Sequence, residues 1–153
     1  MPLDPGDAAP AMRADNQDGE TIELDFAEPT VLYFYPRDAT RGCSVEAREF
    51  DAELDGYRAA GVAVYGVSTD DVDSHAAFAD SEGLRFDLLA DPDGEVAGAF
   101  GVEVREGGHE PAAARTTFVL ADGEVRGVYT GVDPEGHASE VLADLRELGL
   151  GDG

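Results

Sequence analysis

The cysteine at position 43 is the only thiol in the sequence, and it stands where an apolar strand pattern gives way to a helical one. The junction, residues 36–46, reads PRDATRGCSVE. Loops at the carboxyl ends of parallel strands carry the functional groups of many α/β folds. With Thr40 as N-cap, Cys43 lies in the first helical turn, where the helix dipole and free N–H groups favour the thiolate. Arg37 and Arg41 add positive charge to the loop, so this segment predicts a reactive thiolate.

A second interpretation of Cys43 stays open at this point. Free cysteines are among the most buried residue types, and Cys43 shares an apolar stripe with Phe50 and Leu54. The thiol would then be an inert part of the core, in a non-catalytic acidic module that binds a partner through its charged face. A thiol–disulfide exchange protein is disfavoured, because the sequence has no Cys-x-x-Cys pair.

Other groups that could do chemistry have the wrong spacing. His75, His109 and His137 are far apart in the sequence and lack the spacing of metal ligands. We expect these histidines to be solvated or to cap helices. The segment Asp91–Glu95 (DPDGE) lacks the third acidic residue of a calcium loop and is typical of a turn. We therefore expect neither a metal nor a cofactor.

The composition excludes several classes of protein. The chain has 153 residues, with 34 acidic against 10 basic residues and a formal net charge of -24. This charge repels phosphates, which disfavours nucleic acid and anionic membranes as partners. No apolar run is long enough for a membrane span, and the N-terminal segment lacks a signal-peptide pattern, so we expect a cytoplasmic protein. All basic residues are Arg, and this Lys-free, acid-rich composition suggests a halophilic cytoplasm, where salt screens self-repulsion.

Two apolar runs frame the Cys43 segment. Thr30–Tyr35 (TVLYFY) and Val62–Ser68 (VAVYGVS) have the β-branched and aromatic content of strands that are buried on both faces. Between them, Cys43–Ala60 carries an apolar stripe at helical spacing, and Gly61 ends it. Strand, helix and strand in this order predict a βαβ unit with parallel strands.

The remaining segments complete an α/β domain. Weaker patterns predict a strand at Glu20–Phe26, helices at Val72–Glu82 and Pro134–Leu148, a short apolar stretch at Leu84–Leu89 and a short helix at Glu95–Phe100. Thr116–Leu120 and Glu124–Thr130 flank Asp122-Gly123, which is a strong hairpin signal. Glu103–Ala114, rich in Gly, Ala and charge, is predicted to be the longest loop. No shift in composition marks a boundary, so we expect one domain over residues 1–153.

The residues around Cys43 resemble the active-site signature of the peroxiredoxins, in which Pro, three residues, Thr or Ser and two residues precede the Cys. The residues that carry the resemblance are Tyr33-Phe34-Tyr35-Pro36, Thr40, Gly42-Cys43-Ser44 and Glu46. The flanking sequence is most similar to the bacterioferritin-comigratory-protein or Q-type subfamily. Ordered matches continue over most of the chain, at Gly6-Asp7, Gly66-Val67-Ser68, Ser74-His75, Arg115-Thr116-Thr117-Phe118 and Gly136-His137-Ala138. So many matches in order are far more specific than one short motif.

The resemblance implies a thioredoxin-like fold, with a central mixed sheet flanked by helices, an N-terminal extension and an insertion before the hairpin. It also implies the reduction of hydrogen peroxide and organic hydroperoxides. Cys43 would be the peroxidatic nucleophile, Thr40 would hydrogen-bond the thiolate and the peroxide, and Arg115 would reach in from the strand that opens the hairpin. Pro36 would shield the site from water, and Glu46 would orient an arginine. Such donors suit an in-line attack, which places charge on two oxygens.

Two positions depart from the subfamily pattern. Many members carry a resolving cysteine five residues after the nucleophile, where this sequence has Arg48, and no other Cys exists. We therefore expect a one-Cys mechanism, in which an external thiol reduces the sulfenic acid. The reductant would be a thioredoxin- or glutaredoxin-like protein, a low-molecular-weight thiol, or Cys43 of a second subunit. The usual Pro before Gly-Cys is Arg41 here, which bears on the rigidity of the loop. Monomer and homodimer both stay open.

Overall fold

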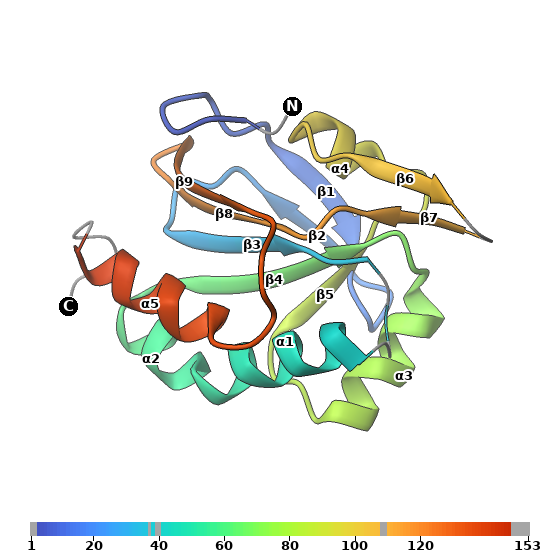
Figure 1. The fold of residues 1–153 in the computed structure, drawn as a ribbon. Helices are drawn as coiled ribbons and strands as arrows, with labels where there is room; N and C mark the ends of the chain where they lie inside the picture. The colour runs from blue at the N-terminus through green and yellow to red at the C-terminus, as the bar shows by residue number, and fades with distance from the viewer. Residues whose placement is uncertain (1–2, 37, 39–40, 108–109, 148–153) are drawn as a thin grey trace.

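The computed structural model describes residues 3–36, 38, 41–107 and 110–147. A five-stranded sheet forms its centre, in the order β5-β4-β3-β8-β9 (Figure 1). The strands β3 (Thr30–Phe34), β4 (Ala63–Ser68) and β5 (Asp87–Ala90) are parallel to one another. β8 (Thr116–Ala121) runs antiparallel to β3 and pairs on its other side with β9 (Glu124–Thr130). The sheet is therefore mixed, as expected.

Helices and two small hairpins cover the two faces of this sheet (Figure 1). One face carries α1 (Arg41–Ala52), α2 (Leu54–Ala59), α3 (Val72–Glu82) and α5 (His137–Glu147). The other face carries α4 (Glu95–Ala99), the pair β1 (Met12–Asp15) and β2 (Thr21–Leu24), and the pair β6 (Val104–Gly107) and β7 (Glu110–Ala113). Among the described residues, none of the helices has the length and apolarity needed to cross a bilayer.

The strand β3 is buried along its whole length, and its side chains pack into both halves of the core. Val31 and Tyr33 pack with the helices of the α1 face, whereas Leu32 and Phe34 pack toward α4 and the β1–β2 pair. Side chains of a strand alternate between the two faces, which explains why the run TVLYF is apolar without interruption. Full burial of one such side chain contributes about 1.5–3 kcal/mol, so β3 is a rigid base for the segment that follows it.

The strongest sequence patterns are confirmed. Thr30–Tyr35 and Val62–Ser68 contain the parallel strands β3 and β4, with a helical segment between them. The Asp122-Gly123 turn joins β8 to β9, and both residues have positive φ, 55° and 72°. Two consecutive positive φ angles are the signature of a type I′ turn, whose twist matches that of the flanking strands.

Three sequence-based expectations need correction. Glu103–Ala114 is not a loop, because β6 and β7 pair there in regular antiparallel register from Val104↔Ala113 to Gly107↔Glu110. The backbone hydrogen bonds between the two halves of this segment make them strands, and the glycine content does not prevent this pairing. The helix expected over Cys43–Ala60 begins at Arg41 and is divided in two at Glu53, although its apolar stripe stays buried. The half-buried strand β1 was not expected, and it pairs with β2 at the N-terminal end.

Candidate active site

Cys43 is placed by the junction between β3 and α1. Tyr35 and Pro36 follow the last residue of β3, and α1 begins at Arg41, so Cys43 lies in its first turn, as predicted. The side chain of Cys43 is buried, with 1% of its surface exposed, and packs in the core cluster of the α1 face. Pro36 is half-buried at the bend after β3, and Arg41 is exposed. Thr40 and Arg37, also predicted at the site, lie outside the described residues.

The sheet brings Arg115 to the same place. Thr116, the first residue of β8, pairs with Phe34, the last residue of β3. Arg115 therefore stands level with the end of β3, where the Cys43 segment begins. Its Nη2 group donates a hydrogen bond to Cys43 Sγ at 3.5 Å. Gly42 leaves the space for this approach, because a Cβ at that position would lie 3.2 Å from Arg115 Nη2.

Glu46 fixes the other side of the guanidinium. It lies one turn after Cys43 on α1, and its Oε1 accepts a hydrogen bond from Arg115 Nη1 at 2.6 Å. The side chain of Glu46 is fully buried, and its Oε2 has no hydrogen-bond partner among the described residues. Burial raises the pKa of Glu46 to about 7, against the opposing attraction of Arg115. Partial burial lowers the pKa of Arg115, but attraction to Glu46 and Cys43 outweighs this effect and raises it overall.

Three of the predicted residues thus form one contact chain, Glu46–Arg115–Cys43. A guanidinium beside a sulfur at a helix N-terminus stabilises the thiolate, which is the nucleophilic form of cysteine. The other amino group of the Arg115 guanidinium, Nη1, is hydrogen-bonded to Glu46, so the guanidinium is oriented before any substrate arrives. This arrangement can attack an electrophilic oxygen and stabilise the charge that develops on it.

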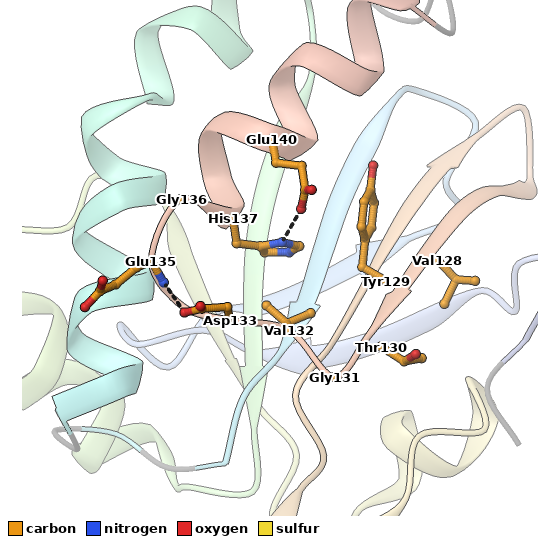
Figure 2. Close-up of a pocket in the computed structure, with 10 residues that line it drawn as sticks. All are labelled: Val128, Tyr129, Thr130, Gly131, Val132, Asp133, Glu135, Gly136, His137 and Glu140. Atoms are coloured by element: carbon orange, nitrogen blue, oxygen red, sulfur yellow. Dashed lines mark hydrogen bonds and ion pairs between the residues drawn. The ribbon is translucent and has the colours of Figure 1, made fainter.

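A cavity of about 490 Å³ lies beside this chain but does not contain it. The cavity is formed by the end of β9, the loop after it and the start of α5 (Figure 2). The loop also carries Pro134, whose Cγ lies 3.4 Å from the position of a Cβ built on Gly42. His137 lines the cavity, and its Nε2 is 2.8 Å from Thr117 Oγ1. Burial lowers the pKa of His137, although nearby Glu140 opposes this shift.

The expectation that the histidines are solvated or cap helices is wrong for His75 and His137. The exposed fraction is 0% for His75 and 4% for His137. Each imidazole has a polar partner inside the protein, so it needs no solvent contact. His75 Nδ1 meets Asp38 Oδ2 at 2.7 Å, a contact that sequence reasoning missed. The only signal was the Ser74-His75 pair within the family resemblance. His109 lies outside the described residues.

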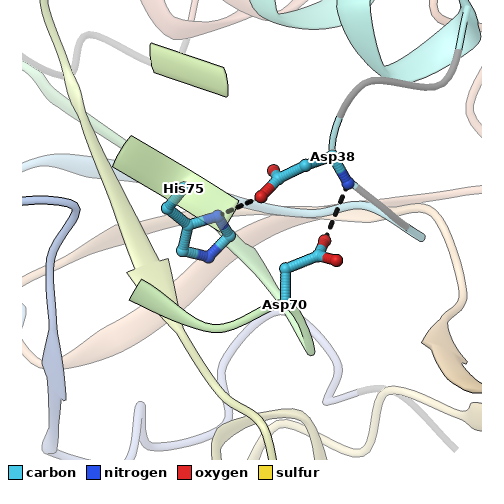
Figure 3. A group of neighbouring side chains, drawn as sticks. All are labelled: Asp38, Asp70 and His75. Carbon is cyan, nitrogen blue, oxygen red and sulfur yellow. Dashed lines mark hydrogen bonds and ion pairs between the residues drawn. The ribbon is translucent and has the colours of Figure 1, made fainter. Parts of the chain in front are cut away.

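Asp38, Asp70 and His75 are the described residues that come closest to a metal-binding cluster (Figure 3). One ligand atom of each lies within 4.8 Å of the others. Hydrogen bonds already connect them: Asp38 N donates to Asp70 Oδ2, and His75 Nδ1 contacts Asp38 Oδ2, each at 2.7 Å. A cation would have to displace these bonds, so we assign no metal to the cluster.

Comparisons with known proteins show the family to which the chain belongs. Residues 5–128 match the model of the AhpC/TSA family. The chain is 38% identical over 152 residues to Peroxiredoxin Bcp of Escherichia coli. The match covers 95% of this chain and 97% of that protein. Peroxidoxin BcpB of Mycobacterium tuberculosis has a TM-score of 0.89 at 32% identity, over 95% of this chain and 98% of that one.

A third relative is the bacterioferritin comigratory protein of Xanthomonas campestris, whose structures concern its alkyl peroxide reduction activity. It has a TM-score of 0.85 at 32% identity, over 95% of this chain and 99% of that one. These likenesses confirm the thioredoxin-like fold and the family that the residues around Cys43 suggested. The chain belongs to the AhpC/TSA family and, within it, to the peroxiredoxins of the bacterioferritin-comigratory-protein or Q type, which are thiol-dependent peroxidases.

Proposed function

We propose that Cys43 is the peroxidatic nucleophile and that hydrogen peroxide and organic hydroperoxides are its substrates. The observation that carries the proposal is the guanidinium of Arg115, which is held by Glu46 at 2.6 Å and donates to Cys43 Sγ at 3.5 Å. A thiol that merely fills the core needs no cation beside it, so this contact does not favour an inert, non-catalytic module. The alkyl peroxide reduction activity of the Xanthomonas relative supports organic hydroperoxides as substrates.

The reaction is a displacement at oxygen. The Cys43 thiolate attacks one oxygen of the hydroperoxide, so that an S–O bond forms while the O–O bond breaks. The other oxygen leaves with the electron pair and takes up the proton that the thiol released, which yields water or an alcohol. Cys43 is oxidised to the sulfenic acid, and the hydroperoxide is reduced. Arg115 stabilises the thiolate before the attack and the negative charge during it.

Two further residues complete the proposed site. Thr40, which lies outside the described residues, supplies a hydroxyl donor to the thiolate and the peroxide. Pro36 occupies the bend after β3 and is half-buried, which suits a role in keeping water from the sulfur. Glu46 contributes by orienting Arg115 rather than by touching the substrate.

The regeneration step needs a thiol from outside the chain, because Cys43 is the only cysteine. An external thiol attacks the sulfenic sulfur and releases water, and a second thiol then frees Cys43 as a disulfide forms between the two reductant thiols. Cys43 is 1% exposed, so a disulfide between two subunits would require α1 to open in both. A small thiol or a thioredoxin- or glutaredoxin-like protein is therefore the better reductant, for a monomer or a homodimer. This chemistry suits a reducing compartment, and we place it in the cytoplasm.

The test combines peroxide, a sulfenic-acid trap and intact-protein mass. We expect the wild-type chain to be labelled at Cys43 in buffer at neutral pH, and the Cys43→Ser variant to lose both labelling and peroxide consumption. The melting temperature of the variant serves as its folding control. If the wild-type thiol is labelled only after denaturant is added, Cys43 is an inert core residue and the proposal fails.

A further inference from the structure

A second buried polar cluster holds the segment that leads into Cys43. Asp38 lies in that segment, five residues before Cys43, and is 8% exposed. Its carboxylate accepts hydrogen bonds from Tyr35 Oη at 2.6 Å and Ser74 Oγ at 2.8 Å, and it meets His75 Nδ1 at 2.7 Å. Its backbone N–H donates to Asp70 Oδ2 at 2.7 Å (Figure 3). Both the side chain and the backbone of Asp38 are thus tied to neighbouring elements.

The hydrogen bonds of His75 determine where its protons lie. Nε2 is 3.0 Å from the carbonyl oxygen of Leu89, which can only accept, so Nε2 carries a hydrogen. Nδ1 faces Asp38 Oδ2 at 2.7 Å, which requires one more proton between the ring and the carboxylate. The pair therefore holds that proton as imidazolium and carboxylate or as imidazole and carboxylic acid. Without it, two lone pairs would face each other in a buried site.

Among the described residues, few titratable groups face His75. The titratable groups that face it are Asp38 from the segment before α1 and Tyr35, whose Oη is 3.4 Å from Nδ1. Tyr35 Oη donates to Asp38 Oδ1, and Asp70 accepts from Asp38 N and from Ser68 Oγ. Four side chains therefore contact Asp38, those of Tyr35, Asp70, Ser74 and His75, and the last two join Asp38 to α3.

We propose that His75 is a positioning residue for the chemistry of Cys43. Its Nδ1 contact fastens Asp38, which lies between β3 and α1 in the chain, to α3. The Cys43 turn is then held from two sides, by α3 through Asp38 and by β8 through Arg115 and Glu46. Loss of the contact between His75 and Asp38 loosens the first attachment, so that Cys43 Sγ moves relative to Arg115 Nη2. This inference rests on the proposed function, because it requires Cys43 to be the nucleophile.

The test separates positioning from plain stability. His75→Leu removes the contact to Asp38, whereas the amide of His75→Asn donates to Asp38 at every pH. Asp91→Asn is the matched control, because Asp91 is also a buried carboxylate, 5% exposed, and its hydrogen bonds go to the backbone of α4, on the other face of the sheet. The rate of Cys43 oxidation by peroxide is measured for each chain at neutral pH, together with its melting temperature.

We expect His75→Leu to react about tenfold to a hundredfold more slowly than wild type, as for a displaced reacting group. His75→Asn, whose amide donates to Asp38 in place of Nδ1, should keep a rate close to that of wild type. Asp91→Asn should lower the melting temperature and leave the rate unchanged. The inference is overturned if His75→Leu reacts at the wild-type rate, or if His75→Leu does not fold and the folded His75→Asn variant reacts tenfold or more slowly than wild type. A wild-type Cys43 that does not react at all contradicts the proposed function instead.

Discussion

Arg115 Nη1 donates to Glu46 Oε1 at 2.6 Å, although the two residues are 69 positions apart in the chain. The contact joins the strand β8 to the helix α1, and the Glu46 side chain within it is fully buried. Buried pairs of this kind gain little net stability, but removal of one partner leaves the other charge uncompensated. The pair orients the Arg115 guanidinium, because with Nη1 bonded to Glu46 the Nη2 group points at Cys43 Sγ.

Arg115→Lys tests the need for a forked cation. One ammonium group cannot contact Glu46 and Cys43 in the geometry of a guanidinium. We expect peroxide consumption to slow by about a hundredfold, as when one preorganised donor is removed from an active site. Arg126→Lys is the control, since Arg126 pairs with the exposed Asp122. Equal rates for wild type and Arg115→Lys would remove Arg115 from the mechanism.

Glu46 should make stability depend on pH. Its pKa is about 7 in the folded chain against 4.5 for the free group, so the folded state binds this proton more tightly than the unfolded state. The protonated form therefore stabilises the fold, and that contribution is lost as the pH rises from the unfolded to the folded pKa. The difference corresponds to roughly 3 kcal/mol.

Urea unfolding of wild type and Glu46→Gln below and above this window measures the effect. The free energy of unfolding of wild type should fall relative to that of Glu46→Gln as the pH rises. Glu124→Gln, at an exposed position on β9, should follow wild type. Parallel curves for wild type and Glu46→Gln would contradict the prediction.

Local patterns predicted most of the fold because their causes are local. The uninterrupted run of β3 follows from burial on both faces, and the Asp122-Gly123 turn follows from two residues that tolerate positive φ. The hairpin β6–β7 was missed because its pairing depends on backbone hydrogen bonds between segments without apolar alternation. The strand β1 is short and half-buried, so its four residues carry little periodic signal.

The site was predictable to a similar degree. Cys43 and Glu46 share one helix at a spacing of three, so a helical pattern places them together. Arg115 joins them only through the pairing of β3 with β8, and its part was inferred from family resemblance. The contact of Asp38 with His75 spans 37 positions. It depends on the packing of α3 against the segment before α1, which no local pattern encodes.

The charge of -24 predicts that salt stabilises the chain. The Debye length falls from about 10 Å at 0.1 M to about 3 Å at 1 M, which screens repulsion among the acidic side chains. We expect the melting temperature to rise with sodium chloride, by roughly 2–4 °C for each kcal/mol gained. A neutral osmolyte at matched osmolality is the control for effects other than screening. A melting temperature that does not change with salt would contradict both the prediction and the halophilic interpretation.

Gly66 on β4 should not tolerate alanine. A Cβ there would lie 2.9 Å from Tyr33 Cζ and 3.0 Å from Leu88 Cδ2, both in the buried core. Overpacking of this kind costs about 1–3 kcal/mol, which urea unfolding of Gly66→Ala will show. Gly127→Ala on β9 is the matched control, because its nearest neighbour, Val119 Cβ, is at an ordinary 3.7 Å. Similar losses for the two variants would mean that steric crowding at Tyr33 is not the cause.

Arg48→Cys tests whether α1 opens after oxidation. Arg48 is exposed on α1, five residues after Cys43, and its side chain pairs with Glu82 of α3. Five residues of helix rise about 7.5 Å, whereas a disulfide requires Cα atoms within about 7 Å. A thiol at position 48 can therefore reach the oxidised Cys43 only if the first turns of α1 unwind.

With one equivalent of peroxide, we expect the sulfenic acid of Arg48→Cys to condense with the new thiol and release water. The product should be two hydrogens lighter than the reduced chain and lose helical signal in far-ultraviolet circular dichroism. Arg48→Ser removes the same ion pair without adding a thiol, so it should stop at the sulfenic acid, one oxygen heavier. If the sulfenic acid of Arg48→Cys persists as long as that of Arg48→Ser, α1 stays closed after oxidation, and an external thiol must reach Cys43 by another opening.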